Sequence, residues 1–86
     1  MDEVVEVKVA RVHTDAQLPT KGSAHAAGWD IHALQDTEVL YRNATLVRTG
    51  LHVAIPIGYE GQVRARSSLG KKGLIPPHGI GTIDAD

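Results

Sequence analysis

The run Leu51-His-Val-Ala-Ile-Pro-Ile-Gly-Tyr-Glu-Gly-Gln-Val-Arg-Ala65 contains two short strand patterns separated by a turn. Apolar residues dominate residues 51–55, and Pro56 ends this first strand because proline has no N–H to donate to a β-ladder. Residues 57–61 contain two glycines and predict a turn, after which residues 62–65 predict a second strand. The unit therefore indicates a β-protein.

Similar short strands are predicted on both sides of this unit. Residues 4–12 (VVEVKVARV) alternate apolar and charged side chains over most of their length, which is the period of a half-buried strand. Further strands are expected at residues 29–33, 38–41, 44–48 and 80–84. Many short strands separated by Gly and Pro turns predict an all-β fold, which is a sandwich, a barrel or a jelly roll.

The length and composition indicate one small domain. The chain has 86 residues and no cysteine, so neither a disulfide nor a thiolate metal site supports its small core. The missing cysteine also fits a reducing compartment such as the cytoplasm. The sequence ends at Asp86, two residues after the last predicted strand, which is an unusual way to end a domain. We therefore expect residues 1–86 to be a single incomplete domain, truncated on its C-terminal side.

Charge and hydropathy argue against two classes of partner. Nine Lys and Arg residues against ten Asp and Glu give a net charge of −1, whereas binding to nucleic-acid backbones requires a positive excess. No apolar run approaches the roughly 20 residues of a membrane span, and the acidic N-terminus does not resemble a signal peptide. We therefore expect no nucleic-acid partner and no membrane partner.

A basic segment follows the strand–turn–strand unit. Arg64-Ala-Arg-Ser-Ser-Leu-Gly-Lys-Lys-Gly73 combines four cations, two adjacent hydroxyls and two glycines. Arginine offers a planar fork of donors that matches phosphate oxygens, and Ser67 and Ser68 can add donors or cap a short helix. A phosphate-binding loop and a solvated basic loop both explain this composition.

Two aspartates are candidates for chemistry. Asp84 and Asp86 lie two apart, so on a strand they share one face, where they can bind a metal or act as a base. A solvated acidic end is the alternative, and we favour it for Asp86. Asp30 follows Ala-Gly-Trp and is either a ligand for a metal or an aspartate at a turn or strand edge.

Other reactive side chains carry weaker patterns. The five histidines have no compact zinc spacing, and neither Ser67 nor Ser68 lies in the Gly-x-Ser-x-Gly pattern of a nucleophile. Trp29 is expected to be buried in the core or against a partner rather than to cover a ligand, since large aromatic side chains mostly bury area.

Four stretches together resemble one family, the trimeric dUTPases. Residues 27–31 (AGWDI) resemble its first motif, residues 66–70 (RSSLG) the second and residues 81–86 (GTIDAD) the third. The turn at residues 56–61 (PIGYEG) also occupies its usual place before the second motif. The resemblance covers essentially the whole chain, which matches about the first two thirds of a family member.

The resemblance implies a jelly-roll homotrimer that hydrolyses dUTP to dUMP and pyrophosphate with Mg²⁺. It implies that Asp84 hydrogen-bonds the deoxyribose 3′-hydroxyl and orients or activates the attacking water. It implies that Arg66, Ser67 and Ser68 hold phosphate oxygens, and that Asp30 reaches Mg²⁺ through water. It also implies that a hairpin receives uracil and that this hairpin contains His78, Gly81, Thr82 and Ile83.

The sequence departs from the family pattern in places, and two rival functions remain open. Ser68 occupies a position where the family usually has glycine, and His78 occupies one where some members have asparagine. The later family motifs have no counterpart before Asp86. We therefore expect little or no activity from the 86-residue chain alone. One rival is dCTP deaminase, whose signature also contains an Arg-Ser-Ser-Leu run. The other is a non-catalytic fragment that binds nucleotides or a protein partner.

Overall fold

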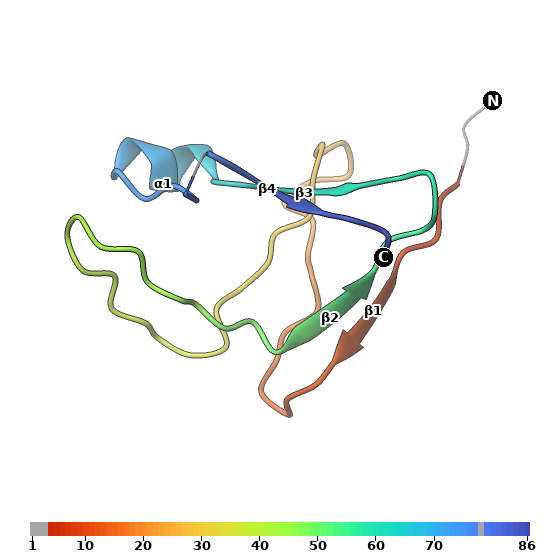
Figure 1. Cartoon of the computed structure of the whole chain (residues 1–86), viewed down its shortest axis with the longest axis horizontal. Helices are drawn as coiled ribbons and strands as arrows, with labels where there is room; N and C mark the ends of the chain where they lie inside the picture. Colours follow the sequence, from red (N-terminus) through yellow and green to blue (C-terminus); the bar gives the residue numbers. More distant parts are fainter. Residues whose placement is uncertain (1–3, 78) are drawn as a thin grey trace. The chain divides into compact units, whose positions relative to one another are not determined.

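The computed structural model describes residues 4–77 and 79–86 of the chain. It contains short strands and one short helix, joined by turns and extended segments (Figure 1). The elements in chain order are β1 (Lys8–Arg11), β2 (Leu51–Ala54), β3 (Gly61–Arg64), α1 (Ser67–Lys71) and β4 (Ile80–Ile83). The strands form two two-stranded sheets, because β1 pairs with β2 and β3 pairs with β4.

The chain divides into two compact units. One unit joins the N-terminal residues up to Lys8 to Ala54–Asp86, and the other unit is Val9–Val53. The expectation of a single domain over residues 1–86 stays a prediction. Within the described part of the chain, α1 is the only helix, and it is far too short to cross a membrane.

The Val9–Val53 unit contains most of β1 and β2, which run in opposite directions in Figure 1. The Val12 N–H donates to the Gly50 carbonyl over 2.8 Å, just outside the paired strands. In β2 the side chains of Leu51 and Val53 are half-buried while those of His52 and Ala54 are exposed. The strand expected at residues 51–55 is therefore confirmed over Leu51–Ala54.

A close contact at Gly50 organises this unit. Gly50 has a φ of +72°, and a Cβ added there would lie 2.9 Å from the Ala16 Cβ and 3.2 Å from the Leu34 Cδ1. Ala16 is the one buried residue in the described part of the chain, with 4% of its surface exposed. Only glycine satisfies both the left-handed backbone and the space available at this position.

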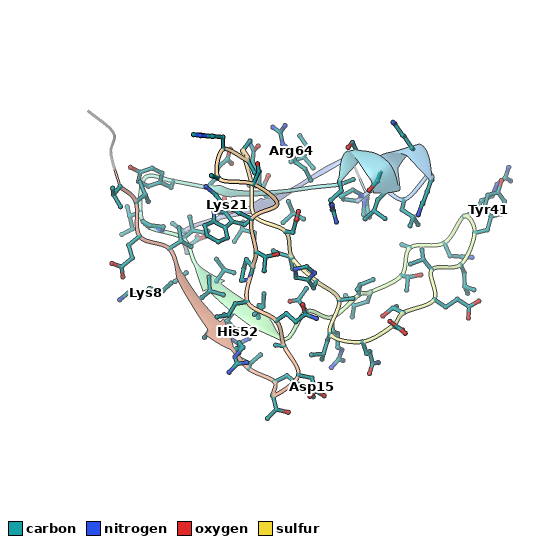
Figure 2. The ribbon with its side chains drawn as sticks, turned by 180° about the vertical axis from the view of Figure 1, so that it is seen from behind. Lys8, Asp15, Lys21, Tyr41, His52 and Arg64 are labelled. Atoms are coloured by element: carbon teal, nitrogen blue, oxygen red, sulfur yellow. The ribbon has the colours of Figure 1, made fainter. Side chains whose placement is uncertain are left out.

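Three of the strands expected from the sequence are not formed. Residues 29–33 contribute only an isolated bridge between Thr20 and Asp30, and residues 38–41 and 44–48 form no strand. Apolar alternation alone does not make a strand, because a strand needs a partner with which to exchange backbone hydrogen bonds. Residues 38–48 form an extended loop instead, and Figure 2 shows Tyr41 at its tip, with its side chain directed away from the ribbon.

The other unit contains the β3–β4 ladder and α1. β3 and β4 are antiparallel, with Gly61 opposite Ile83 at one end and Arg64 opposite Ile80 at the other. A turn precedes β3, in which the Tyr59 N–H donates to the Pro56 carbonyl over 3.1 Å. The strands and the turn expected in this region are confirmed, although β3 begins and ends one residue earlier than its sequence pattern and β4 ends one residue earlier.

Most large apolar side chains of the described residues are exposed to a substantial degree. Trp29 is 63% exposed, so it does not fill a core within this chain. Of the two places in which its burial was expected, the core and a partner, the core is therefore wrong. Its ring instead lies 5.3 Å from the Lys21 ammonium, a distance that allows a cation–π interaction. This difference arises because the described residues form almost no buried core in which the ring could pack.

Candidate functional site

The predicted phosphate-binding residues lie at the start of α1. Arg66 has an extended backbone (φ −67°, ψ 147°) and occupies the N-cap position, and the first helical hydrogen bond runs from the Gly70 N–H to the Arg66 carbonyl. Ser67 and Ser68 therefore lie inside the first turn of the helix. The hypothesis that a serine hydroxyl caps this helix is wrong, because the N-cap is Arg66 and no side chain makes a capping hydrogen bond.

This helix start combines several donors. The side chains of Arg66, Ser67 and Ser68 are exposed. Backbone N–H groups in the first turn of an α-helix have no acceptor inside the helix, and the helix dipole places partial positive charge there. No acidic residue lies in the first turn of α1. The segment can therefore bind an anion through a guanidinium, two hydroxyls and backbone amides.

The end of α1 is fixed by its own backbone. The Leu74 N–H donates to the Leu69 carbonyl over 2.9 Å, and the Gly73 N–H donates to the Gly70 carbonyl over 3.0 Å. With Gly73 at φ +82°, these two bonds form a Schellman motif, which ends a helix and satisfies its last carbonyls. The basic segment is therefore a defined helical turn rather than an open loop.

Asp84 lies where the chain leaves the β3–β4 ladder. Ile83 is the last paired residue of β4, opposite Gly61, and Asp84 follows it with an exposed side chain. Gly81 and Thr82 lie within β4, opposite Val63 and Gln62 respectively. Gly81 and Ile83 are half-buried, whereas Thr82 is exposed, so alternate residues of β4 face opposite sides. The predicted site residue His78 lies outside the described residues.

Asp30 is held by a backbone bridge that sequence reasoning missed. The Thr20 N–H donates to the Asp30 carbonyl over 3.0 Å, and the Asp30 N–H donates to the Thr20 carbonyl over 2.6 Å. The Thr20 Oγ1 also lies 3.0 Å from the His32 Nε2, within hydrogen-bonding distance. No local pattern signals this pairing, because residues 13–23 have the composition of a loop.

The structure groups the predicted residues by unit. Arg66, Ser67, Ser68 and Asp84 belong to the unit that contains Ala54–Asp86, and Asp30 belongs to Val9–Val53. Among the residues that the structure describes, no three His, Asp or Glu side chains lie together as metal ligands. A single half-buried carboxylate such as Asp30 nevertheless suits Mg²⁺, which keeps several waters and often binds through one or two carboxylates together with substrate phosphates.

A side-chain ladder along β3 is a further feature that the sequence analysis did not identify. The Gln62 Nε2 donates to the Glu60 Oε1 over 3.1 Å, and the Arg64 Nη2 donates to the Gln62 Oε1 over 2.9 Å. Arg64 is labelled in Figure 2. Residues two apart share one face of a strand, so polar side chains at this spacing were the available signal.

The motifs and their places on this β-framework match one class of protein. The dUTPase family model matches residues 14–86, and the chain belongs to the dUTPase family. The family expected from the four stretches is thereby confirmed.

Individual relatives support the same assignment. The chain is 47% identical over 92 residues to the deoxyuridine 5′-triphosphate nucleotidohydrolase of Syntrophotalea carbinolica, covering 98% of this chain and 59% of the relative. It is 44% identical over 78 residues to the probable deoxyuridine 5′-triphosphate nucleotidohydrolase of Schizosaccharomyces pombe, covering 91% of this chain and 55% of the relative. The chain therefore spans little more than half the length of these proteins.

A solved structure shows the same fold. A point mutant of the dUTPase of Staphylococcus bacteriophage 80alpha superposes with a TM-score of 0.82 at 26% sequence identity. The match covers 95% of this chain and 52% of the phage protein. The predicted all-β fold of the dUTPase type is confirmed.

Proposed function

We propose that the protein hydrolyses dUTP to dUMP and pyrophosphate. The observation that carries the proposal is the position of Asp84, an exposed carboxylate directly after the β3–β4 ladder, in the same unit as the donor-rich start of α1. The names of its relatives, deoxyuridine 5′-triphosphate nucleotidohydrolases, support dUTP as the substrate.

Asp84 is the residue proposed to act on the nucleophile. A carboxylate accepts a hydrogen bond from water and takes its proton as the oxygen attacks phosphorus, while the anhydride bond to the departing pyrophosphate breaks. General-base assistance of this kind contributes roughly 10²–10⁴-fold to a rate. Its place beside the last paired residue of β4 supports this role, because a base has to be held in a fixed orientation.

Arg66, Ser67 and Ser68 are proposed to hold the phosphate oxygens. The arginine fork can bind two oxygens at once, and the serine hydroxyls and first-turn amides add short donors. Ser68 replaces the glycine that is usual in the family, and its exposed side chain at the helix start leaves room for the hydroxyl to bind a phosphate oxygen itself.

Asp30 is proposed to contact Mg²⁺ through water. When bound, the ion neutralises charge on the triphosphate. The Thr20–Asp30 bridge supports the proposal, since two backbone hydrogen bonds fix the residue that carries the carboxylate.

The uracil ring is proposed to bind along β4, with contributions from Gly81, Thr82, Ile83 and His78. In the described sheets β4 pairs only with β3, so backbone N–H and C=O groups on its other edge are available to a ligand. A pyrimidine edge that pairs with fixed backbone groups is recognised strongly, because a wrong base leaves buried polar groups unpaired.

We also propose that the complete protein is a homotrimer in the cytoplasm. The exposed apolar side chains support association, since a surface of this kind usually marks an interface. The chain matches little more than half of each relative, which favours a second proposal, that the 86-residue chain alone binds nucleotide without turning it over.

Two forms of the protein test these proposals. The first is the 86-residue chain, and the second is the extended chain, which we define as this sequence followed by the residues of the Syntrophotalea carbinolica protein that lie C-terminal to the matched segment. We expect the extended chain to release pyrophosphate from dUTP with Mg²⁺, and the 86-residue chain to show almost no release. Ammonia release from dCTP, with no pyrophosphate from dUTP, would instead support a deaminase.

A further inference from the structure

We propose that Gly61 is a positioning residue for Asp84. Because Gly61 has no side chain, Ile83 can pack directly against the backbone of β3, and this contact fixes the direction in which the chain leaves the ladder. The inference rests on the proposed role of Asp84 in dUTP hydrolysis.

The register of the ladder places Gly61 next to the site. Gly61 and Ile83 are the terminal pair of β3 and β4, and Asp84 is bonded directly to Ile83. The Asp84 side chain is exposed, so the position of its carboxylate depends mainly on the backbone of Ile83. Any displacement of Ile83 is therefore passed to Asp84 through one peptide unit (Figure 1 shows β4 leading to the C-terminus).

The space at Gly61 is too small for a side chain. A Cβ added there would lie 3.2 Å from the Ile83 Cβ and 3.1 Å from the Ile55 Cδ1, both shorter than ordinary van der Waals contacts. All three residues are half-buried. Gly61 does not have the positive φ found at Gly50 or Gly58, so close packing rather than backbone conformation requires glycine at this position.

The two neighbours differ in how they can respond to alanine. The Ile55 Cδ1 is the end of a flexible side chain and can rotate away. The Ile83 Cβ is bonded to its own Cα, so it can yield only if the backbone of β4 moves. A Gly61→Ala substitution therefore displaces Ile83 and Asp84 together, by the few tenths of an ångström that the contact lacks.

A displacement of this size affects turnover more than binding. Catalysis is sensitive to geometry, and a 1 Å misplacement can cost about 10²-fold in rate. Arg66, Ser67 and Ser68 are held by the backbone of α1, which has its own hydrogen bonds. We expect Gly61→Ala in the extended chain to lower kcat roughly five- to tenfold and to change the KM for dUTP less than about twofold.

Two further variants separate positioning from stability. Gly58→Ala strains the turn before β3, but its added Cβ meets no atom within 4 Å, so it should lower the unfolding midpoint and leave kcat unchanged. Ile55→Val removes the Cδ1 atom that the Cβ added by Gly61→Ala would meet, and it leaves the Ile83 contact in place. Added to Gly61→Ala, it should restore part of the unfolding midpoint without restoring kcat.

The outcomes distinguish this inference from the proposed function. Unchanged kcat in Gly61→Ala, or full recovery of kcat on adding Ile55→Val, would overturn the positioning role. If the unsubstituted extended chain does not hydrolyse dUTP, the proposed function fails, and the inference is then tested by NMR on the same extended chain. There Gly61→Ala should shift the amide resonance of Asp84 more than that of Gly73, and equal shifts would overturn it.

Discussion

Asp84 and Asp86 are a matched pair of exposed carboxylates at the residue scale. They differ in their distance from the ladder, because Asp84 adjoins the last paired residue of β4 and Asp86 lies two residues further on. The residues alone placed both on one face and favoured a solvated end for Asp86, and the resemblance to the dUTPase family implied the chemical role of Asp84. In the structure only Asp84 of the pair is bonded directly to a residue that pairs with β3.

The pair gives a prediction with an internal control. In the extended chain, Asp84→Asn should lower kcat for dUTP by at least about 10²-fold, since the amide cannot take a proton from water. Asp86→Asn removes the same charge and should change kcat less than about twofold. Unfolding midpoints should be similar for both variants, because both side chains are exposed. Equal losses of activity would contradict the assignment of Asp84.

Arg66 and Arg64 form a second pair, with one residue between them. In the extended chain, Arg66→Lys keeps the charge but loses the fork that binds two phosphate oxygens, so the KM for dUTP should rise roughly tenfold. Arg64→Lys is the matched control, because Arg64 donates to Gln62 in the β3 ladder and has no assigned phosphate. A larger effect at Arg64 than at Arg66 in steady-state kinetics would show that the phosphate lies elsewhere.

The elements differ in how well the sequence predicted them. β2, β3 and β4 were predictable because Gly or Pro turns delimit them and because they find partners within the chain. Residues 38–41 and 44–48 are also rich in apolar side chains but pair with no strand in the described structure, so the strands predicted there do not form. The Thr20–Asp30 bridge joins backbone groups ten residues apart, a pairing that composition does not encode.

Gly50 provides a test of how the Val9–Val53 unit is packed. Gly50→Ala forces a left-handed backbone and a Cβ 2.9 Å from Ala16, and should lower the free energy of unfolding by about 2–4 kcal/mol. Gly70→Ala in α1 is the control, since nothing lies within 4 Å of its added Cβ, and it should stabilise the protein by about 0.5–1 kcal/mol. Urea unfolding of the extended chain measures both, and equal effects would contradict the contact at Gly50.

At the scale of the whole molecule, the described residues bury very little apolar surface. Ala16 is the one buried residue among them, while the side chains of Ile57 and Leu46 are 93% and 82% exposed. The free energy of unfolding of a folded protein is small, and the hydrophobic effect is its main favourable contribution. The sequence predicted a small core, and the structure shows which apolar side chains remain to be covered.

This surface predicts how the two forms differ in solution. The 86-residue chain should bind the dye ANS strongly and unfold in urea over a broad range, because its apolar side chains are open to solvent. The extended chain should bind less dye and unfold in one sharp transition, since the added residues cover part of that surface. Equal dye binding by both forms would show that the exposed side chains are covered in another way.

Pyrophosphate release by the extended chain, with Mg²⁺ and with dUTP, dCTP or dTTP as substrate, tests the central claim most directly. The proposed site predicts rapid release from dUTP, little from the other two nucleotides, and a loss of at least about 10²-fold in Asp84→Asn. Release that does not depend on the base, or that survives Asp84→Asn, would contradict the proposed site.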